Sequence, residues 1–88
     1  MARIDIYTTE YCPYCHAALA LLDRKGAAYE IIPVDGDPEL RQLMMRRASG
    51  RYTVPQIFIG PVHVGGYDDL ADLERRGALD PLLAGPGQ

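Results

Sequence analysis

Long apolar runs are absent from this chain of 88 residues, and none approaches the roughly 18 apolar residues of a membrane span. Positive charge is also scarce, because nine lysines and arginines stand against twelve aspartates and glutamates, which argues against a nucleic-acid-binding face. No apolar secretory segment opens the chain, so we expect a cytoplasmic protein. With only two cysteines in such a compartment, a catalytic or metal-binding pair is favoured over a structural disulfide.

The residues that are present suffice for one small folded domain. Hydrophobic residues make up 48% of the chain, which favours a packed core over disorder. The sequence shows neither an internal repeat nor an interior linker. We therefore expect one domain over residues 1–83 and a flexible tail over residues 84–88.

The first part of the chain predicts a strand, a helix and a second strand. Alternating apolar residues predict a strand over residues 3–8, and the segment YEIIPV predicts a second strand over residues 29–34. Between them, apolar residues at i, i+3, i+4 and i+7 predict a helix that ends at Gly26. Its predicted buried stripe consists of Cys15, Ala18, Leu19 and Leu22. A helix of this length between two strands indicates a parallel βαβ unit.

The rest of the chain predicts two more helices and a hairpin. A second helix begins after Asp37 as its N-cap and ends at Gly50. Its mostly apolar face consists of Leu40, Leu43, Met44 and Arg47. The segments QIFI and VHV predict a hairpin, and a final helix over residues 67–76 is expected to have Asp68 as its cap. The order β-α-β-α-β-β-α predicts an α/β fold with a mixed four-stranded sheet flanked by three helices.

The two cysteines of the segment CPYC differ in their predicted surroundings. Pro13 suits the first helical position, because its missing N–H would have no helical partner there. Cys12 is then the N-cap, where its sulfur can accept hydrogen bonds from the amides of Tyr14 and Cys15 and the helix dipole stabilises negative charge. Both effects favour the thiolate. We expect a redox pair, with an exposed, activated Cys12 and a shielded Cys15 that resolves a mixed disulfide.

Other uses of a C-x-x-C pair are weaker alternatives. Because His16 follows Cys15, the segment also matches a haem-attachment motif, but haem attachment requires export to an oxidising compartment. A zinc site would need two more ligands, for which only His16 and His63 are available, and His16 is expected to point away from the cysteines. An inert buried pair is the third alternative, which the N-cap position of Cys12 disfavours.

Two further segments suit a peptide-like ligand. In YTVPQIF, Pro55 cannot donate a hydrogen bond to a strand, so Val54 before it can offer its backbone N–H and C=O to an extended peptide. In GGYDD, two glycines before an Asp-capped helix form a small anion site with a carboxylate nearby for an ammonium group. Taken singly, the first segment also fits the start of an edge strand, and the second an ordinary turn with an N-cap.

Together these motifs resemble a known family. TxxxCPYC, TVPQIFI and GGxDDL, in this order and at these distances, are similar to dithiol glutaredoxins of the bacterial glutaredoxin 3 type, over nearly the whole chain. The resemblance implies the thioredoxin fold, with Pro55 as a cis-proline facing the cysteines. It implies a glutathione-dependent thiol–disulfide oxidoreductase, in which Cys12 is the nucleophile and Cys15 is the resolving thiol.

The resemblance also implies that glutathione is a co-substrate and that no cofactor or metal is bound. Tyr14 is implied to flank the tripeptide, and Val54, with Thr53 before it, to pair its backbone with the glutathione cysteine. Gln42 matches a position that contacts the glycine carboxylate in relatives, and Arg41 and Arg51 are charged neighbours that can assist it. The implied glutathione-binding residues are Tyr14, Gln42, Arg51, Thr53, Val54, Pro55, Gly66, Tyr67, Asp68 and Asp69. The last three hold the γ-glutamyl end.

The implied partners are glutathione, glutathionylated and disulfide-containing proteins such as ribonucleotide reductase, and glutathione reductase indirectly. We expect a monomer that binds neither nucleic acid nor membrane. Some relatives instead bridge a [2Fe–2S] cluster between two subunits, but Pro13 is expected to disfavour this. Because the chain has no tryptophan, nothing in it resembles the tryptophan-containing thioredoxin motif, which argues against reduction by thioredoxin reductase.

Two positions depart from the family pattern. Thr9 stands three residues before the first cysteine, where relatives usually have a lysine or arginine that supports the thiolate and the glycine carboxylate. Tyr67 stands after Gly-Gly, where relatives often have a third cysteine. We expect Tyr67 to stack or form a hydrogen bond near the γ-glutamyl group instead.

Overall fold

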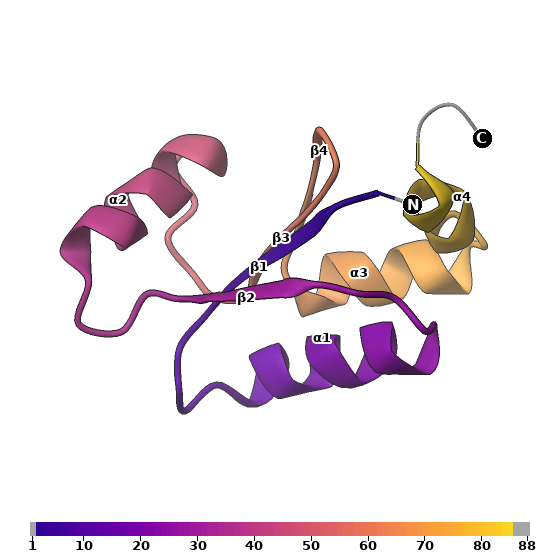
Figure 1. Ribbon diagram of the computed structural model, residues 1–88, viewed down its shortest axis with the longest axis horizontal. Helices are drawn as coiled ribbons and strands as arrows, with labels where there is room; N and C mark the ends of the chain where they lie inside the picture. Colours follow the sequence, from indigo (N-terminus) through magenta and orange to yellow (C-terminus); the bar gives the residue numbers. More distant parts are fainter. Residues whose placement is uncertain (1, 86–88) are drawn as a thin grey trace.

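The structure is a computed structural model and describes residues 2–85. Its elements are β1 (Ile4–Thr8), α1 (Pro13–Arg24), β2 (Glu30–Pro33), α2 (Pro38–Arg47), β3 (Gln56–Ile59), β4 (Val62–Gly65), α3 (Tyr67–Arg75) and α4 (Leu79–Ala84). The strands form one sheet in the order β2-β1-β3-β4 (Figure 1). β1 pairs parallel with β2, and the other pairings are antiparallel. The predicted α/β class and mixed four-stranded sheet are confirmed.

The described residues form four helices, whereas the sequence predicted three. The additional helix, α4, has six residues and includes Pro81, so it is too short for helical periodicity to reveal it. Leu79 and Leu83 anchor it in the core. α4 also includes Ala84, the first residue of the predicted tail. Residues 86–88 of that tail lie outside the described residues, and the boundary after residue 83 stays a prediction.

Two hydrophobic clusters form the core. The helices that cover them lie on opposite faces of the sheet, with α2 on one face and α1 and α3 on the other (Figure 1). The larger is built mainly from Ile4, Ile6, Ala18, Leu22, Ile57, Ile59, Leu70 and Leu79, under α1, α3 and α4. The smaller lies under α2 and contains Tyr7, Val34, Met44, Ala48 and Phe58. Since successive strand residues point to opposite faces, this two-sided cover buries every residue of the central strand β1.

Two helical faces differ from their predictions. On α1, Leu21 belongs to the buried stripe and Leu19 is only partly buried, because α1 packs against α3 as well as against the sheet. On α2, Met44 is buried but Leu43 is 39% exposed. The helix also ends at Arg47, before the predicted Gly50. Its predicted N-cap is confirmed, because Asp37 Oδ1 accepts a hydrogen bond of 3.1 Å from the Leu40 N–H.

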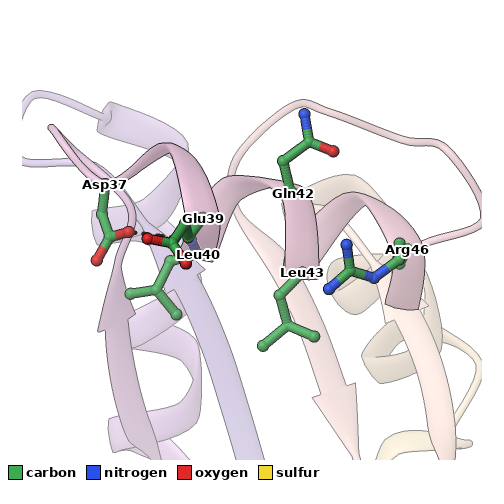
Figure 2. Close-up of a pocket in the computed structure, with 6 residues that line it drawn as sticks. All are labelled: Asp37, Glu39, Leu40, Gln42, Leu43 and Arg46. Carbon is green, nitrogen blue, oxygen red and sulfur yellow. Dashed lines mark hydrogen bonds between the residues drawn. The ribbon is translucent and has the colours of Figure 1, made fainter.

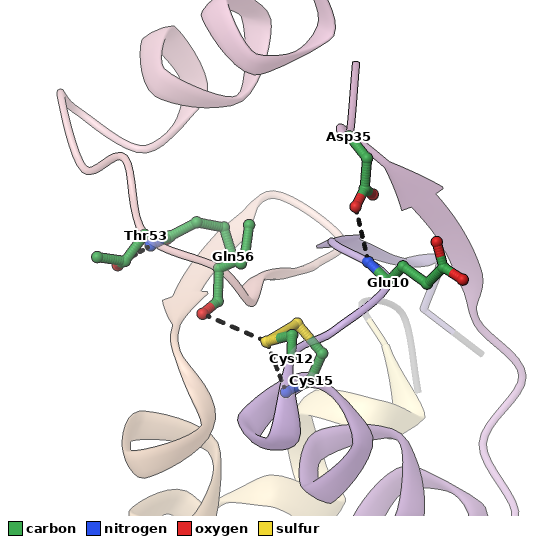
Figure 3. The surroundings of a disulfide bond; sticks show 7 residues. Glu10, Cys12, Cys15, Asp35, Thr53 and Gln56 are labelled. Atoms are coloured by element: carbon green, nitrogen blue, oxygen red, sulfur yellow. Dashed lines mark hydrogen bonds between the residues drawn. A yellow bond between two sulfur atoms is a disulfide. The ribbon is translucent and has the colours of Figure 1, made fainter. Parts of the chain in front are cut away.

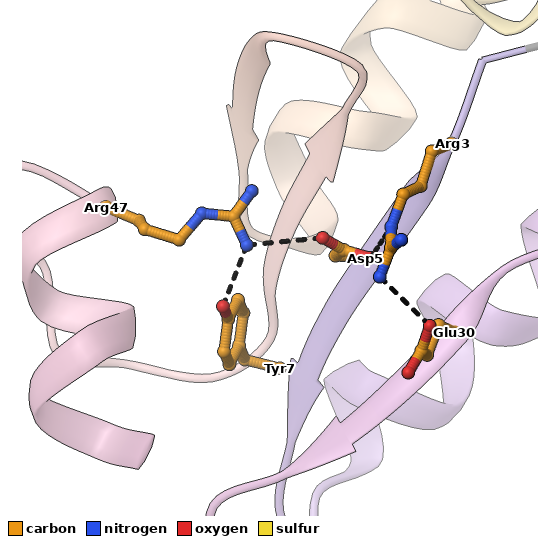
Figure 4. A network of polar contacts seen from close by, with 5 residues as sticks. All are labelled: Arg3, Asp5, Tyr7, Glu30 and Arg47. Atoms are coloured by element: carbon orange, nitrogen blue, oxygen red, sulfur yellow. Dashed lines mark hydrogen bonds and ion pairs between the residues drawn. The ribbon is translucent and has the colours of Figure 1, made fainter. Parts of the chain in front are cut away.

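Arg47 ties α2 to the sheet (Figure 4). Its guanidinium carbon lies 4.1 Å from the centre of the Phe58 ring. Its Nη1 donates to the Tyr7 hydroxyl at 2.8 Å and to Asp5 Oδ2 at 3.2 Å. Arg3 Nε donates to the other carboxylate oxygen of Asp5 at 3.0 Å. The predicted apolar face of α2 therefore ends in a charged group that stacks on an aromatic ring and satisfies a buried carboxylate.

Candidate active site

Cys12 and Cys15 form a disulfide at the N-terminus of α1 (Figure 3). Cys12 is the N-cap and Pro13 is the first helical residue, so both predictions are confirmed. Cys12 Sγ accepts a hydrogen bond of 3.1 Å from the Cys15 N–H. The second predicted hydrogen bond, from the Tyr14 N–H, is not among those that residues 2–85 form. The Cα atoms lie 5.2 Å apart, within the usual range for a disulfide.

The two cysteines differ in burial less than predicted. Cys15 is fully buried, but Cys12 is only 7% exposed and is not the open residue that the sequence suggested. The carbonyl oxygen of Val54 lies 3.8 Å from Cys12 Sγ, so a segment distant in sequence covers it. The direction of the asymmetry is retained, since Cys12 keeps the larger accessible fraction.

The segment Thr53–Pro55 lies against the disulfide. The Val54–Pro55 peptide bond is cis, so the cis-proline that the resemblance implied is confirmed. Among the loop and cap hydrogen bonds between backbone groups in residues 2–85, none uses the N–H or C=O of Val54. The Val54 N–H is therefore available to pair with an extended ligand, and its C=O lies against Cys12 Sγ.

A cavity of about 450 Å³ lies between this segment and the N-terminus of α3, and we refer to it as the α3 cavity. Its lining consists of Tyr14, Arg51, Thr53, Val54, Pro55, Gly66, Tyr67, Asp68 and Asp69. It thus brings together all the residues implied for glutathione binding except Gln42. Gln42 lines a different cavity on α2, beside Leu43 and Arg46 (Figure 2). The rings of Tyr14 and Tyr67 stack with centroids 6.4 Å apart.

The N-terminus of α3 is capped differently from the prediction. The N-cap is Gly66, not Asp68, because the chain is already helical at Tyr67. Asp69 Oδ2 accepts hydrogen bonds from the Gly66 N–H at 2.9 Å and from Arg51 Nη1 at 3.4 Å. The Asp69 carboxylate is therefore engaged within the fold. Asp68 is exposed in the first turn of the helix, where its charge faces the cavity.

Three polar residues hold the Thr53–Pro55 segment in place, a role that the sequence did not predict for any of them. Arg41 Nη1 donates to the Tyr52 carbonyl at 2.9 Å. Gln56 is fully buried, and its Nε2 donates to Thr53 Oγ1 at 3.3 Å. His63 Nε2 donates to Gln56 Oε1 at 2.7 Å, since an amide oxygen only accepts. The signal for this network was a glutamine at the start of the otherwise apolar strand QIFI.

His63 gives the protein a testable pH dependence. Burial lowers the pKa of His63 from its ordinary value of 6.5, and Arg51 and Arg47 lower it further against the opposing effect of Asp69. The unfolded chain therefore binds a proton at pH values at which the folded protein leaves His63 neutral. In this range the free energy of unfolding becomes smaller as the pH is lowered. We expect the free energy of unfolding to decrease from about pH 6.5 downward.

Urea unfolding between about pH 7.5 and about pH 5.5 measures this slope above the range in which ordinary carboxylates titrate. His63→Gln should remove most of it. His16→Gln, at an exposed helical position, is the matched control and should leave the slope unchanged. An unaltered slope in His63→Gln would contradict the assignment.

Thr9 does not line the α3 cavity. It belongs to a cavity on the other side of the disulfide, with Glu10, His16 and Asp35. Within residues 2–85, no group of three or more His, Cys, Asp or Glu residues has an arrangement that can hold a metal ion. In the same part of the chain, no helix combines the length and hydropathy needed to cross a membrane.

Comparisons with known proteins agree with this geometry. The glutaredoxin family model matches residues 4–64. Glutaredoxin 3 of Escherichia coli K12 is 57% identical over 83 residues, which cover 94% of this chain and 99% of that protein. A glutaredoxin of Pseudomonas aeruginosa is 56% identical over 84 residues, covering 96% and 99% of the two chains.

Solved structures give the same result. The crystal structure of a buckwheat glutaredoxin–glutathione complex superposes with a TM-score of 0.85 at 31% identity, covering 94% of this chain and 77% of that one. The solution structure of glutaredoxin from Brucella melitensis has a TM-score of 0.83 at 58% identity, with 94% and 89% covered. The thioredoxin fold is confirmed. The chain belongs to the glutaredoxin family and is a glutathione-dependent thiol–disulfide oxidoreductase that acts through its cysteine pair.

Proposed function

We propose that Cys12 is the nucleophile and that it acts on protein–glutathione mixed disulfides held in the α3 cavity. The Cys12 thiolate attacks the glutathione sulfur, the disulfide bond to the protein breaks, and the protein leaves as a thiolate that takes up a proton. A second glutathione, as thiolate, then attacks the glutathione sulfur now bound to Cys12. Glutathione disulfide leaves, and the Cys12 thiolate is regenerated.

Protein disulfides follow a second route in this proposal. Cys12 attacks one sulfur of the substrate disulfide and forms a mixed disulfide with the protein, releasing the other sulfur as a thiolate. The Cys15 thiolate then attacks Cys12 Sγ and displaces the second substrate thiolate. The product on the enzyme is the Cys12–Cys15 disulfide, which is the bond present in the structure. Two glutathione molecules reduce it and leave as glutathione disulfide.

The surroundings of Cys12 support its role as the attacking thiolate. Its sulfur accepts a hydrogen bond from the Cys15 N–H at the N-terminus of α1, where the helix dipole favours negative charge. Cys15 is fully buried behind it, so an incoming disulfide meets Cys12 first. Thr9 adds no charge near this sulfur, which leaves the helix terminus as the main source of thiolate stabilisation.

The shape and charge of the α3 cavity carry the proposal for glutathione. Glutathione has a carboxylate at each end, one ammonium group and a peptide backbone between them. The cavity offers the Val54 backbone beside Cys12, with the N-terminus of α3 and the Asp68 carboxylate further along. Such an arrangement suits backbone pairing in the middle of the ligand and charge pairing at its γ-glutamyl end.

Individual contacts can be proposed on the same basis. Asp68, which faces the cavity, is assigned to the γ-glutamyl ammonium, and the Gly66 end of α3 to the γ-glutamyl carboxylate. The ion pair of Arg51 with Asp69 supports a place for Arg51 at this end of the ligand as well. The contact of Gln42 with the glycine carboxylate stays a prediction.

The proposed partners are glutathione, glutathionylated proteins and proteins with reducible disulfides, with ribonucleotide reductase as one candidate. Glutathione reductase with NADPH would keep the glutathione pool reduced. That the protein works as a monomer stays a prediction. We further propose the cytoplasm as the site of action, because a redox-active pair that depends on reduced glutathione needs a reducing compartment.

The test is turnover of a glutathionylated peptide, coupled to glutathione reductase and NADPH. Wild type should be active, and Asp68→Asn should raise KM for glutathione about tenfold, the equivalent of about 1.4 kcal/mol for a charge-assisted contact, with little change in kcat. Asp80→Asn, which removes an exposed carboxylate of α4 that lines neither the α3 cavity nor the Gln42 cavity, is the matched control. The proposal would be contradicted if wild type did not turn over the glutathionylated peptide while thioredoxin reductase reduced its Cys12–Cys15 disulfide.

A further inference from the structure

A second cavity, of about 480 Å³, lies beside the redox pair and shares no lining residue with the α3 cavity. It lies between α1 and the strand β2, and we refer to it as the β2-edge groove. Cys15 lies beneath its inner wall, with no exposed surface of its own. Figure 3 shows Glu10 and Asp35 on this side of the disulfide and Thr53 on the other. A molecule in the β2-edge groove can therefore lie next to the disulfide while glutathione occupies the α3 cavity.

The β2-edge groove contains apolar surface that the fold leaves uncovered. Ile31 is 47% exposed, although its pairing partner on β1, Ile6, is fully buried. The difference arises because β2 is an edge strand, with β1 on one side only among the described strands. Leu19 and Pro33 extend this apolar lining. An open groove of this kind along a sheet edge suits the side chains of an extended polypeptide.

The charged groups of the β2-edge groove are of one sign. Its lining includes the carboxylates of Glu10, Asp35 and Asp37 and neither lysine nor arginine. Two of these carboxylates are held by backbone N–H groups: Asp35 Oδ2 accepts from Glu10 at 2.8 Å, and Asp37 Oδ1 accepts from Leu40 at 3.1 Å. Acidic groups around an apolar groove complement a ligand with a cationic side chain next to an apolar one.

We infer that the β2-edge groove binds the polypeptide part of a disulfide substrate, as an extended segment with a lysine or arginine and an apolar residue beside its reactive cysteine. This inference rests on the proposed function, since it places the substrate relative to Cys12. A glutathionylated polypeptide has its glutathione in the α3 cavity and its own chain in the groove. Tyr11, which is 88% exposed next to Cys12, provides aromatic surface at the entrance to the active site.

Two glutathionylated peptides test the inference. Both carry leucine on one side of the cysteine, and they carry lysine or glutamate on the other; the glutathione mixed disulfide of 2-mercaptoethanol is the reference substrate. We expect wild type to turn over the lysine peptide with a kcat/KM about fivefold higher than the glutamate peptide, as for an exposed charge pair. High salt should reduce this preference.

Variants of the groove residues test whether the preference for the lysine peptide arises in the β2-edge groove. Glu10→Gln should lower the ratio of the two kcat/KM values about threefold. Asp80→Asn is the control, because Asp80 is on α4 and does not line the β2-edge groove, and its side chain is 71% exposed. It should leave the ratio of the two kcat/KM values unchanged. Ile31→Thr, at an exposed strand position, should raise KM for the lysine peptide. The amide NMR signals of Leu19 and Ile31 should shift when a lysine peptide with serine in place of cysteine is added.

The outcomes separate this inference from the proposed function. If wild type turns over the reference disulfide but does not distinguish the two peptides, the inference is wrong and the proposed function stands. NMR shifts confined to the α3 cavity would also overturn it. If the reference disulfide is not turned over, the proposed function itself fails.

Discussion

Cys12→Ser is expected to lower turnover of both glutathionylated and disulfide substrates at least about a thousandfold, whereas Cys15→Ser retains turnover of glutathionylated substrates. The reason is that the glutathione route uses only the sulfur at the N-terminus of α1. The route through a protein disulfide also needs the buried sulfur of Cys15 to release the reduced product. In Cys15→Ser, the substrate protein therefore stays attached to Cys12 until glutathione displaces it.

Two measurements check this prediction. The coupled assay with glutathione reductase compares both variants with wild type on a glutathionylated peptide, under reducing conditions in which none of the three carries the Cys12–Cys15 disulfide. Mass spectrometry then looks for a trapped enzyme–substrate disulfide in Cys15→Ser after addition of a disulfide-containing protein. A Cys15→Ser variant as inactive as Cys12→Ser in the first assay would refute the distinct roles of the two thiols.

Gly65→Ala is expected to damage both stability and glutathione binding. Gly65 has φ +112°, a backbone conformation that residues with a side chain rarely adopt. A Cβ atom there would overlap the Asp69 carboxylate and lie 2.6 Å from Arg51 Nη1. The Asp69 side chain would have to leave the Gly66 N–H, so the charged end of the α3 cavity would change shape. We expect a loss of about 2 kcal/mol in stability and an increase of about tenfold in KM for glutathione.

Gly26→Ala is the matched control, because Gly26 also has a positive φ, of +69°, but a Cβ atom added there would meet nothing within 4 Å. Gly26→Ala should lower the free energy of unfolding by about 1 kcal/mol, because alanine is strained at a positive φ, and should leave KM for glutathione unchanged. Urea unfolding and the coupled assay measure both quantities. A Gly65→Ala variant with wild-type KM would show that the contacts of Asp69 do not shape the binding site.

The placement of Cys12 at a helix N-terminus follows from local chemistry that can be read in the sequence. A strand followed by Cys-Pro and an amphipathic run can begin its helix in few places, because proline fits the first helical turn and lacks the N–H needed further in. The same kind of local signal placed Asp37 as a cap. The alternation of β1 and the motifs around Pro55 and Gly66 likewise identified the segments that meet in the active site.

Other features were decided by packing between distant segments, and local patterns did not contain them. Leu21 is buried because α1 meets α3, and Leu43 is exposed because the apolar face of α2 is narrower than its pattern suggested. Cys12 is covered by Val54, which lies more than 40 positions later in the chain. These outcomes depend on which surfaces are in contact, whereas periodicity reports only which side chains share a face.

The sequence by itself determined the redox pair, its position at the start of α1, and the segments that form the site. The tertiary structure decided which groups in those segments remain available to a ligand. It engaged Asp69 with Gly66 and Arg51, placed Gln42 in another cavity, and opened the β2-edge groove beside Cys15. The physical reason is that hydrogen bonds, ion pairs and edge positions form between elements, and they are fixed only when the sheet and helices assemble.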